Sequence, residues 1–216
     1  MGLPQTRKGG IAPSAAGEIG RRSRTADAVL IGPGMVDRTA TCGLVLKLLR
    51  QLDGKVVLDA EALACASVDR RAIAAAKAEL ALTPHAGEMA QMLAEPISGI
   101  ERDRAGTALR AARTLRAVVA LKGAETFIAA PGGRLLCNRN AGNAGLGTSG
   151  SGDTLSGIVV GLAARGADLL KSAAWAVFLH GRAGDILARK VGPLGYLARE
   201  LLAEIPREMA RLSRRG

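Results

Sequence analysis

The segment from Asn143 to Arg165 joins a loop rich in glycine, serine and threonine to apolar residues at helical spacing. Gly150 and Gly152 have no Cβ, so a ligand can approach bare backbone N–H groups there. Because a helix begins directly after the loop, these N–H groups also lie at the positive end of its dipole. The segment therefore predicts an anion site at the start of this helix.

Asp153 is the residue of this segment that suggests catalysis. A carboxylate beside a phosphate site repels the phosphate, so its presence there indicates a chemical task such as removing a proton. The structural alternative is an N-terminal helix cap, because Asp is among the favoured capping residues. A short glycine motif alone does not decide between the two.

Length and composition predict one α/β domain. The chain has 216 residues, of which 48% are hydrophobic and only 2% aromatic, so its core must be aliphatic. Such a core suits alternating strands and helices. The net charge of +11 invites a nucleic-acid function, but the basic residues are spread along helices and few aromatic side chains could stack on bases. We expect no nucleic-acid partner and a surface that favours small anions.

Cysteine and histidine are too few for a disulfide framework or a histidine-rich metal site. The three cysteines lack metal-ligand spacing, and there are only two histidines, so we expect no protein-held metal. The sequence has neither a bilayer-length apolar run nor the pattern of a signal peptide. We therefore expect a cytoplasmic protein without membrane contact.

Hydrophobic periodicity predicts strands and helices in alternation. Residues 1–26 show no sustained period and are predicted to form an irregular or disordered arm, followed by one domain over residues 27–216. Pro206 is predicted to kink or divide the last helix. Strands are expected at 28–31, 56–58, 80–82 and 117–121, with an antiparallel hairpin at 126–130 and 134–137; helices are expected at 39–52, 70–77, 88–93, 103–116, 153–165, 168–190 and 197–212.

Several motifs in this order resemble one family, the NAD(P)H-hydrate dehydratases, which have the ribokinase-like fold. That resemblance implies a three-layer α/β sandwich with a mostly parallel central sheet, here with the family's N-terminal elements missing. The matching segments are DAVLIGPG at 27–34, VVLDAEAL at 56–63, LTPHAGE at 82–88, LKGAETFIA at 121–129, NAGLGTSGSGDTLSGIVVGLAARG at 143–166, and the stretch at 179–185.

The resemblance implies a repair reaction, in which NADH or NADPH that has added water (the S-epimer) is dehydrated with ADP or ATP as cofactor and Mg²⁺ present. By the same resemblance, Asp153 would be the catalytic base, and Gly34, His85 and Asp153 would contact the hydrated dinucleotide. The anion hole for the transferring phosphoryl group would be formed by Ser149, Gly150, Ser151 and Gly152. The adenine nucleotide would be bound by Lys122, Gly123, Ala124, Glu125, Thr126 and Gly152.

Structural alternatives remain for several of these residues. His85 could be a loop histidine whose bonds are satisfied, and Lys122 an ordinary exposed lysine at a strand end. Asp59 and Glu61 could orient Mg²⁺ through water, but a helix cap explains Asp59 equally well.

The function itself also has alternatives. One is a small-molecule kinase of the same superfamily, which would use the same aspartate and anion hole. Another is a non-catalytic paralogue that binds adenine nucleotides. An exposed sheet edge would favour self-association, so a homo-oligomer is expected.

Overall fold

The computed structural model describes residues 2–214, which form a six-stranded sheet in the strand order β1-β2-β3-β4-β5-β6. The first four strands are parallel, and β5 and β6 continue the sheet as an antiparallel hairpin beside β4. The strands are β1 Ala28–Ile31, β2 Lys55–Leu58, β3 Glu79–Leu82, β4 Val118–Leu121, β5 Thr126–Ala129 and β6 Leu135–Asn138.

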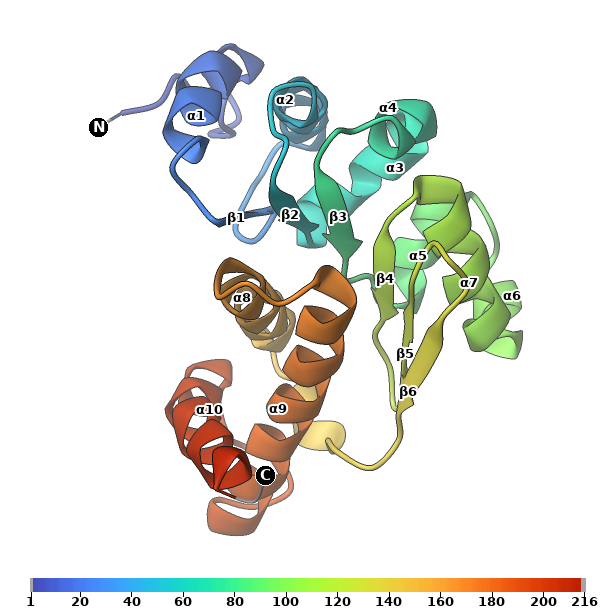
Figure 1. Ribbon diagram of the computed structural model, residues 1–216, viewed down its shortest axis with the longest axis vertical. Coiled ribbons are helices and arrows are strands. Elements are labelled where there is room, and N and C mark those ends of the chain that lie inside the picture. The colour runs from blue at the N-terminus through green and yellow to red at the C-terminus, as the bar shows by residue number, and fades with distance from the viewer. Residues whose placement is uncertain (1, 215–216) are drawn as a thin grey trace.

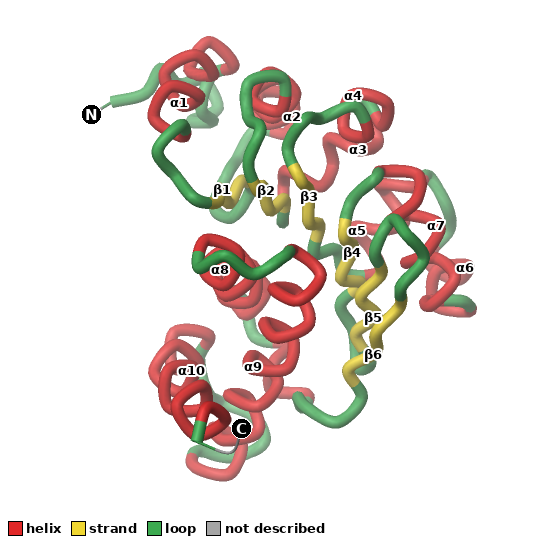
Figure 2. The backbone as a smooth tube through the Cα atoms, in the orientation of Figure 1, coloured by secondary structure: helices red, strands yellow, loops and turns green. Residues whose placement is uncertain are grey.

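Helices cover both faces of this sheet, as Figures 1 and 2 show. Alternation along the strands explains why: in β2, Val56 and Leu58 pack into one apolar core while Val57 packs into the other. The second face carries α8 (Ser151–Ala164) and α9 (Leu169–Lys190), with α10 (Ala198–Ser213) packed outside them. The first carries α2 Arg38–Leu49, α3 Cys65–Val68, α4 Arg70–Ala74, α5 Ala86–Leu93, α6 Ile97–Arg102 and α7 Arg104–Leu115.

This arrangement confirms the predicted three-layer sandwich with a mostly parallel sheet. It also confirms the strands and the terminal hairpin, each within one residue of the expected bounds. Beyond residue 26, the segments that the sequence did not predict are short: a 3₁₀ turn at Ala60–Ala64 that leads into α3, the helix α6, and a 3₁₀ turn at Ala144–Gly147. The alanine-rich helix is shorter than expected, because α4 ends at Ala74.

The prediction of an irregular arm over residues 1–26 is wrong between Pro13 and Ser23. A 3₁₀ turn at Pro13–Ala15 leads directly into α1, Ala16–Ser23. Proline starts this turn, where its missing N–H costs nothing, and Ala15 and Ala16 are buried in the first core. The fully buried residues of this helix, Ala16 and Gly20, are small, and the helix packs against α2.

Pro206 does not divide the last helix. The helix α10 runs continuously from Ala198 to Ser213 with Pro206 inside it. Packing of its apolar side chains against α9 holds the helix together across the proline. None of the helices between residues 2 and 214 combines the length and apolar character needed to cross a membrane.

Candidate active site

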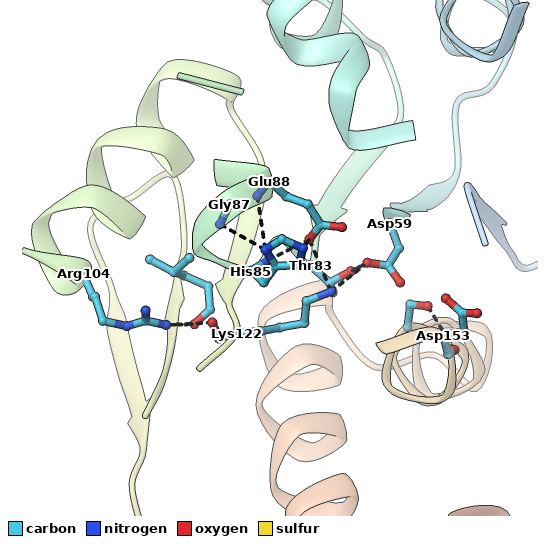
Figure 3. A network of polar contacts seen from close by, with 10 residues as sticks. Asp59, Thr83, His85, Gly87, Glu88, Arg104, Lys122 and Asp153 are labelled. Carbon is cyan, nitrogen blue, oxygen red and sulfur yellow. Dashed lines mark hydrogen bonds and ion pairs between the residues drawn. The ribbon is translucent and has the colours of Figure 1, made fainter. Parts of the chain in front are cut away.

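The carboxyl ends of the parallel strands meet at one edge of the sheet, which is where ligands bind in open α/β sheets. The loops after β2, β3 and β4 bring Asp59, His85 and Lys122 to this edge (Figure 3). A bridge between His85 and Lys122 extends the pairing of β3 with β4, and the Lys122 N–H donates to the Pro84 carbonyl at 2.8 Å. Backbone hydrogen bonds therefore hold the loops after β3 and β4 together, independently of their side chains.

Lys122 has its ammonium group at the centre of the site. Its Nζ lies 3.2 Å from Asp59 Oδ1 and 3.5 Å from Glu88 Oε2. A Cβ placed on Gly152 would lie 3.3 Å from the same nitrogen, so the ammonium group is next to the start of α8. Because the Lys122 side chain is only 19% exposed, it is not an ordinary surface lysine.

Asp59 is a buried anchor for that ammonium group. Its side chain is 1% exposed and also accepts a hydrogen bond from the Thr83 hydroxyl at 2.7 Å. It makes no capping hydrogen bond to the 3₁₀ turn that follows, so the helix-cap interpretation is wrong. Glu61 instead forms an ion pair with Arg38 at 2.7 Å.

Asp153 is the third residue of α8, and it is exposed. The N-terminal cap of this helix is Gly150, at φ +83°, whose carbonyl accepts from the Thr154 N–H at 3.0 Å. The interpretation of Asp153 as a cap is therefore wrong as well. Figure 3 shows Asp153 near Asp59, and α8 packs against β1 and β2.

A cavity of about 640 Å³ opens beside Lys122, which is one of its lining residues. This volume suits a nucleotide-sized ligand. Several predicted site residues do not line the cavity: Gly34, Glu125, Ser149, Gly150 and Asp153. Glu125 instead forms an ion pair with Arg139. The predicted site residues that line the cavity are His85, Lys122, Gly123, Ala124, Thr126, Ser151 and Gly152.

His85 has satisfied hydrogen bonds on one ring nitrogen and is accessible to a ligand at the other. Its Nδ1 accepts hydrogen bonds from the N–H groups of Gly87 (3.0 Å) and Glu88 (3.2 Å), which makes it the N-terminal cap of α5. Because Nδ1 is an acceptor, Nε2 carries the proton of the neutral ring. The side chain is 59% exposed and lines the cavity, so Nε2–H is available to a ligand.

Gly34 lies in the turn after β1, at φ +69°, with open space where a Cβ would be. A neighbouring glycine is more constrained. Gly32 has φ +128°, and a Cβ there would overlap the backbone carbonyl of Asp59. The turn therefore lies directly against the strand end that carries Asp59.

One wall of the cavity is the loop at 141–147, held by residues that the sequence analysis did not assign to the site. Asn143 Oδ1 accepts from the Tyr196 hydroxyl at 2.8 Å and from the Gly145 N–H at 3.0 Å. Asp185 accepts from Asn143 Nδ2 at 3.2 Å. The signal in the sequence was the segment 179–185, which places Gly181, Gly184 and Asp185 on α9 facing this loop. His180, from the same segment, meets Ser151 at the start of α8.

Arg104 holds the opposite wall. From the start of α7, its Nη2 donates to the Lys122 carbonyl at 2.7 Å, and its Nη1 pairs with Glu101. A Cβ on Gly123 would overlap Arg104 Nη2, so a side chain there would displace this guanidinium group. No pattern in the sequence pointed to Arg104, because its partners are backbone carbonyls.

The comparisons with known proteins agree on one family. A family model described as NAD(P)H-hydrate dehydratase matches residues 12–207. The ADP-dependent (S)-NAD(P)H-hydrate dehydratase of Xanthomonas campestris is 42% identical over 99% of this chain and 74% of its own length. A bifunctional NAD(P)H-hydrate repair enzyme of Moorella thermoacetica is 40% identical over 95% of this chain, which spans only 39% of that enzyme.

Solved structures show the same relationship. The crystal structure of the ADP/ATP-dependent NAD(P)H-hydrate dehydratase of Bacillus subtilis, co-crystallised with ATP/Mg²⁺, superposes with a TM-score of 0.79 at 32% identity. The match covers 89% of this chain and 69% of that one. A hydroxyethylthiazole kinase of Pyrococcus horikoshii, at 22% identity and a TM-score of 0.70, shares the fold.

Proposed function

The chain belongs to the NAD(P)H-hydrate dehydratase family, and from that premise we propose that it dehydrates the S-epimer of hydrated NADH or NADPH at the expense of ADP or ATP. The observation that carries the proposal is that Lys122 and the start of α8 line the cavity, whereas the next residue of α8, Asp153, is exposed and does not line it. A phosphoryl donor in the cavity and an acceptor hydroxyl at Asp153 could thus reach the same anion site.

In the first step, the nucleotide occupies the cavity and its terminal phosphoryl group lies at the start of α8. Asp153 removes the proton of the ring hydroxyl while the hydroxyl oxygen attacks phosphorus and the bond to the remaining nucleotide breaks. The Ser151 N–H already donates to the Thr148 carbonyl at 3.2 Å. The backbone N–H groups of Ser149, Gly150 and Gly152 and the ammonium group of Lys122 stabilise the charge on the transferring group.

In the second step, the phosphorylated ring loses phosphate. The lone pair of the ring nitrogen expels it, and loss of a ring proton restores the reduced nicotinamide. ADP thus yields AMP and inorganic phosphate. General base catalysis is typically worth about 10²- to 10⁴-fold, and one anion-hole donor about 10²- to 10³-fold.

Magnesium is assigned to no side chain of this chain. Among the residues at 2–214, no three His, Cys, Asp or Glu side chains gather as metal ligands, and Asp59 and Glu61 already have cationic partners. With these carboxylates already paired, the side chains do not fit a protein-held Mg²⁺.

The test is recovery of the absorbance of reduced nicotinamide when the purified chain is mixed with hydrated NADH, Mg²⁺ and ADP or ATP. Recovery should require the nucleotide and should disappear in Asp153→Asn. Asp53→Asn is the matched control, since Asp53 is an exposed aspartate before β2, at the amino end of the strand, away from the site.

Two results would contradict the proposal. Phosphorylation of a thiazole or pyrimidine alcohol without recovery of NADH would indicate the kinase. Binding of ADP by a folded protein without turnover would indicate the non-catalytic paralogue. Homo-oligomerisation through an exposed sheet edge stays a prediction, which sedimentation of the purified chain tests.

A further inference from the structure

His180 is a buried histidine at the anion site that the proposed mechanism does not use. It projects from α9, and its Nε2 lies 2.9 Å from the Ser151 hydroxyl oxygen. His180 is 8% exposed and Ser151 is 3% exposed, yet both line the cavity. The pair therefore lies just under the surface that would receive the phosphoryl group.

The direction of this hydrogen bond decides what Ser151 can offer a ligand. A serine hydroxyl has a single proton and two lone pairs. If Nε2 is bare, the hydroxyl donates its proton to His180 and presents only lone pairs to the cavity. If Nε2 carries a proton, it donates to the Ser151 oxygen, and the hydroxyl proton is free to point at an anion.

The surroundings keep His180 neutral and in place. Burial, helped by the nearby charge of Lys122, lowers the pKa of His180 to about 4, so the ring adds no charge of its own near neutral pH. Gly181 brings α9 against the loop, because a Cβ there would lie 2.6 Å from the Ala141 carbonyl. The Ser151 N–H donates to the Thr148 carbonyl at 3.2 Å, which holds Ser151 in place opposite His180.

We propose that His180 is a positioning residue for phosphoryl transfer, whose Nε2–H donates to Ser151 Oγ and directs the Ser151 hydroxyl proton at the terminal phosphoryl group of the nucleotide. The inference rests on the proposed function and adds a specific side-chain donor to the backbone N–H groups of the anion site. It assigns the contact with the phosphoryl group to Ser151 and the orientation of that contact to His180.

A double-mutant cycle tests the coupling between the two residues. His180→Leu should lower kcat by about 10-fold or more while the KM for ADP changes little, because the lost donor acts on the transferring group. His180→Gln places an amide N–H near the position of Nε2 and should keep most of the activity. In a Ser151→Ala background, His180→Leu should cost no further activity.

Thermal unfolding of every variant separates a folding defect from an effect on the reaction. Two activity results would overturn the inference: equal losses from His180→Leu with and without the Ser151 hydroxyl, or a Gln variant no better than Leu. Either would mean that His180 only fills space.

A second measurement does not depend on activity. The ¹⁵N chemical shifts of the imidazole ring of the nucleotide-free protein report which nitrogen carries the proton. His85→Gln leaves a single histidine and so assigns the signals. A protonated Nε2 supports the inference and a bare Nε2 overturns it. If the wild-type chain recovers no NADH, the proposed function fails, while this measurement still decides the hydrogen-bond direction.

Discussion

The ion pair between Lys122 and Asp59 gives the most direct test of how the site is held. Asp59 is almost fully buried, and its partners are the Thr83 hydroxyl and the Lys122 ammonium group, 3.2 Å away. At that distance, an effective dielectric constant of about 20 gives an attraction of about 5 kcal/mol, an upper bound on the net effect. Lys122→Met leaves the carboxylate buried without its cation, which typically costs about 3–5 kcal/mol.

Lys122→Met should therefore lower the free energy of unfolding by about 3–5 kcal/mol, or the melting temperature by about 10 °C for a chain of this size. Urea unfolding followed by circular dichroism measures the change. The double variant Lys122→Met/Asp59→Asn should regain more than half of the loss, because the neutral amide can still accept from Thr83. Neither variant should recover NADH, since both lack the ammonium group at the start of α8.

The matched control is Lys171→Met. Lys171 pairs with Asp168 at 3.1 Å, nearly the same distance, but the two side chains are 71% and 50% exposed. Water screens this pair, so its loss should cost less than about 1 kcal/mol. Equal losses for the two lysine variants, or a double variant no more stable than Lys122→Met, would refute the assignment of Asp59 as a buried anchor.

Three further changes test other parts of the site. Gly32→Ala should destabilise the fold by more than about 3 kcal/mol in urea unfolding, because it combines strain at φ +128° with overlap of the Asp59 carbonyl, whereas Gly54→Ala meets open space and should change little. Burial lowers the pKa of His180 from 6.5 to about 4, so between these values the unfolded chain binds a proton that the folded chain does not. The free energy of unfolding should fall by up to about 3 kcal/mol as the pH drops through that window, and a pH series on His180→Gln should lack this component. Arg104→Met removes the donor to the Lys122 carbonyl and should raise the KM for ADP more than it lowers kcat, with Arg102→Met, an exposed arginine at the end of α6, as control.

The sequence was sufficient for the strands because each is a short apolar run that ends in a recognisable loop. In β2, Val56 and Leu58 face one core and Val57 the other, so the whole strand is apolar and easily located. The same reasoning placed Asp59, His85 and Lys122 at one edge, since parallel strands bring their carboxyl ends together. The glycine-rich loop and the start of α8 were located from local pattern alone.

The parts that the sequence did not reveal depend on partners distant along the chain. Arg104 acts on backbone carbonyls, which carry no sequence signal, and His180 meets Ser151 only because α9 packs beside α8. Asp59 resembled a cap because the sequence shows the turn that follows but not the ammonium group of Lys122, 63 residues later. The helix at Ala16–Ser23 was missed for a related reason, since its buried residues, Ala16 and Gly20, are small and their packing partners lie on α2.

The position of Lys122 links the cavity wall held by Arg104 to the start of α8. Its backbone belongs to the wall held by Arg104, and its side chain reaches Asp59 and the start of α8. A shift of that wall therefore moves the ammonium group relative to the anion site. Because buried Asp59 tolerates little displacement of its cation, the wall, the lysine and α8 are constrained together. Substitutions in α7, such as Arg104→Met, should consequently weaken nucleotide binding more than they slow phosphoryl transfer, even though this helix contributes no residue to the cavity lining.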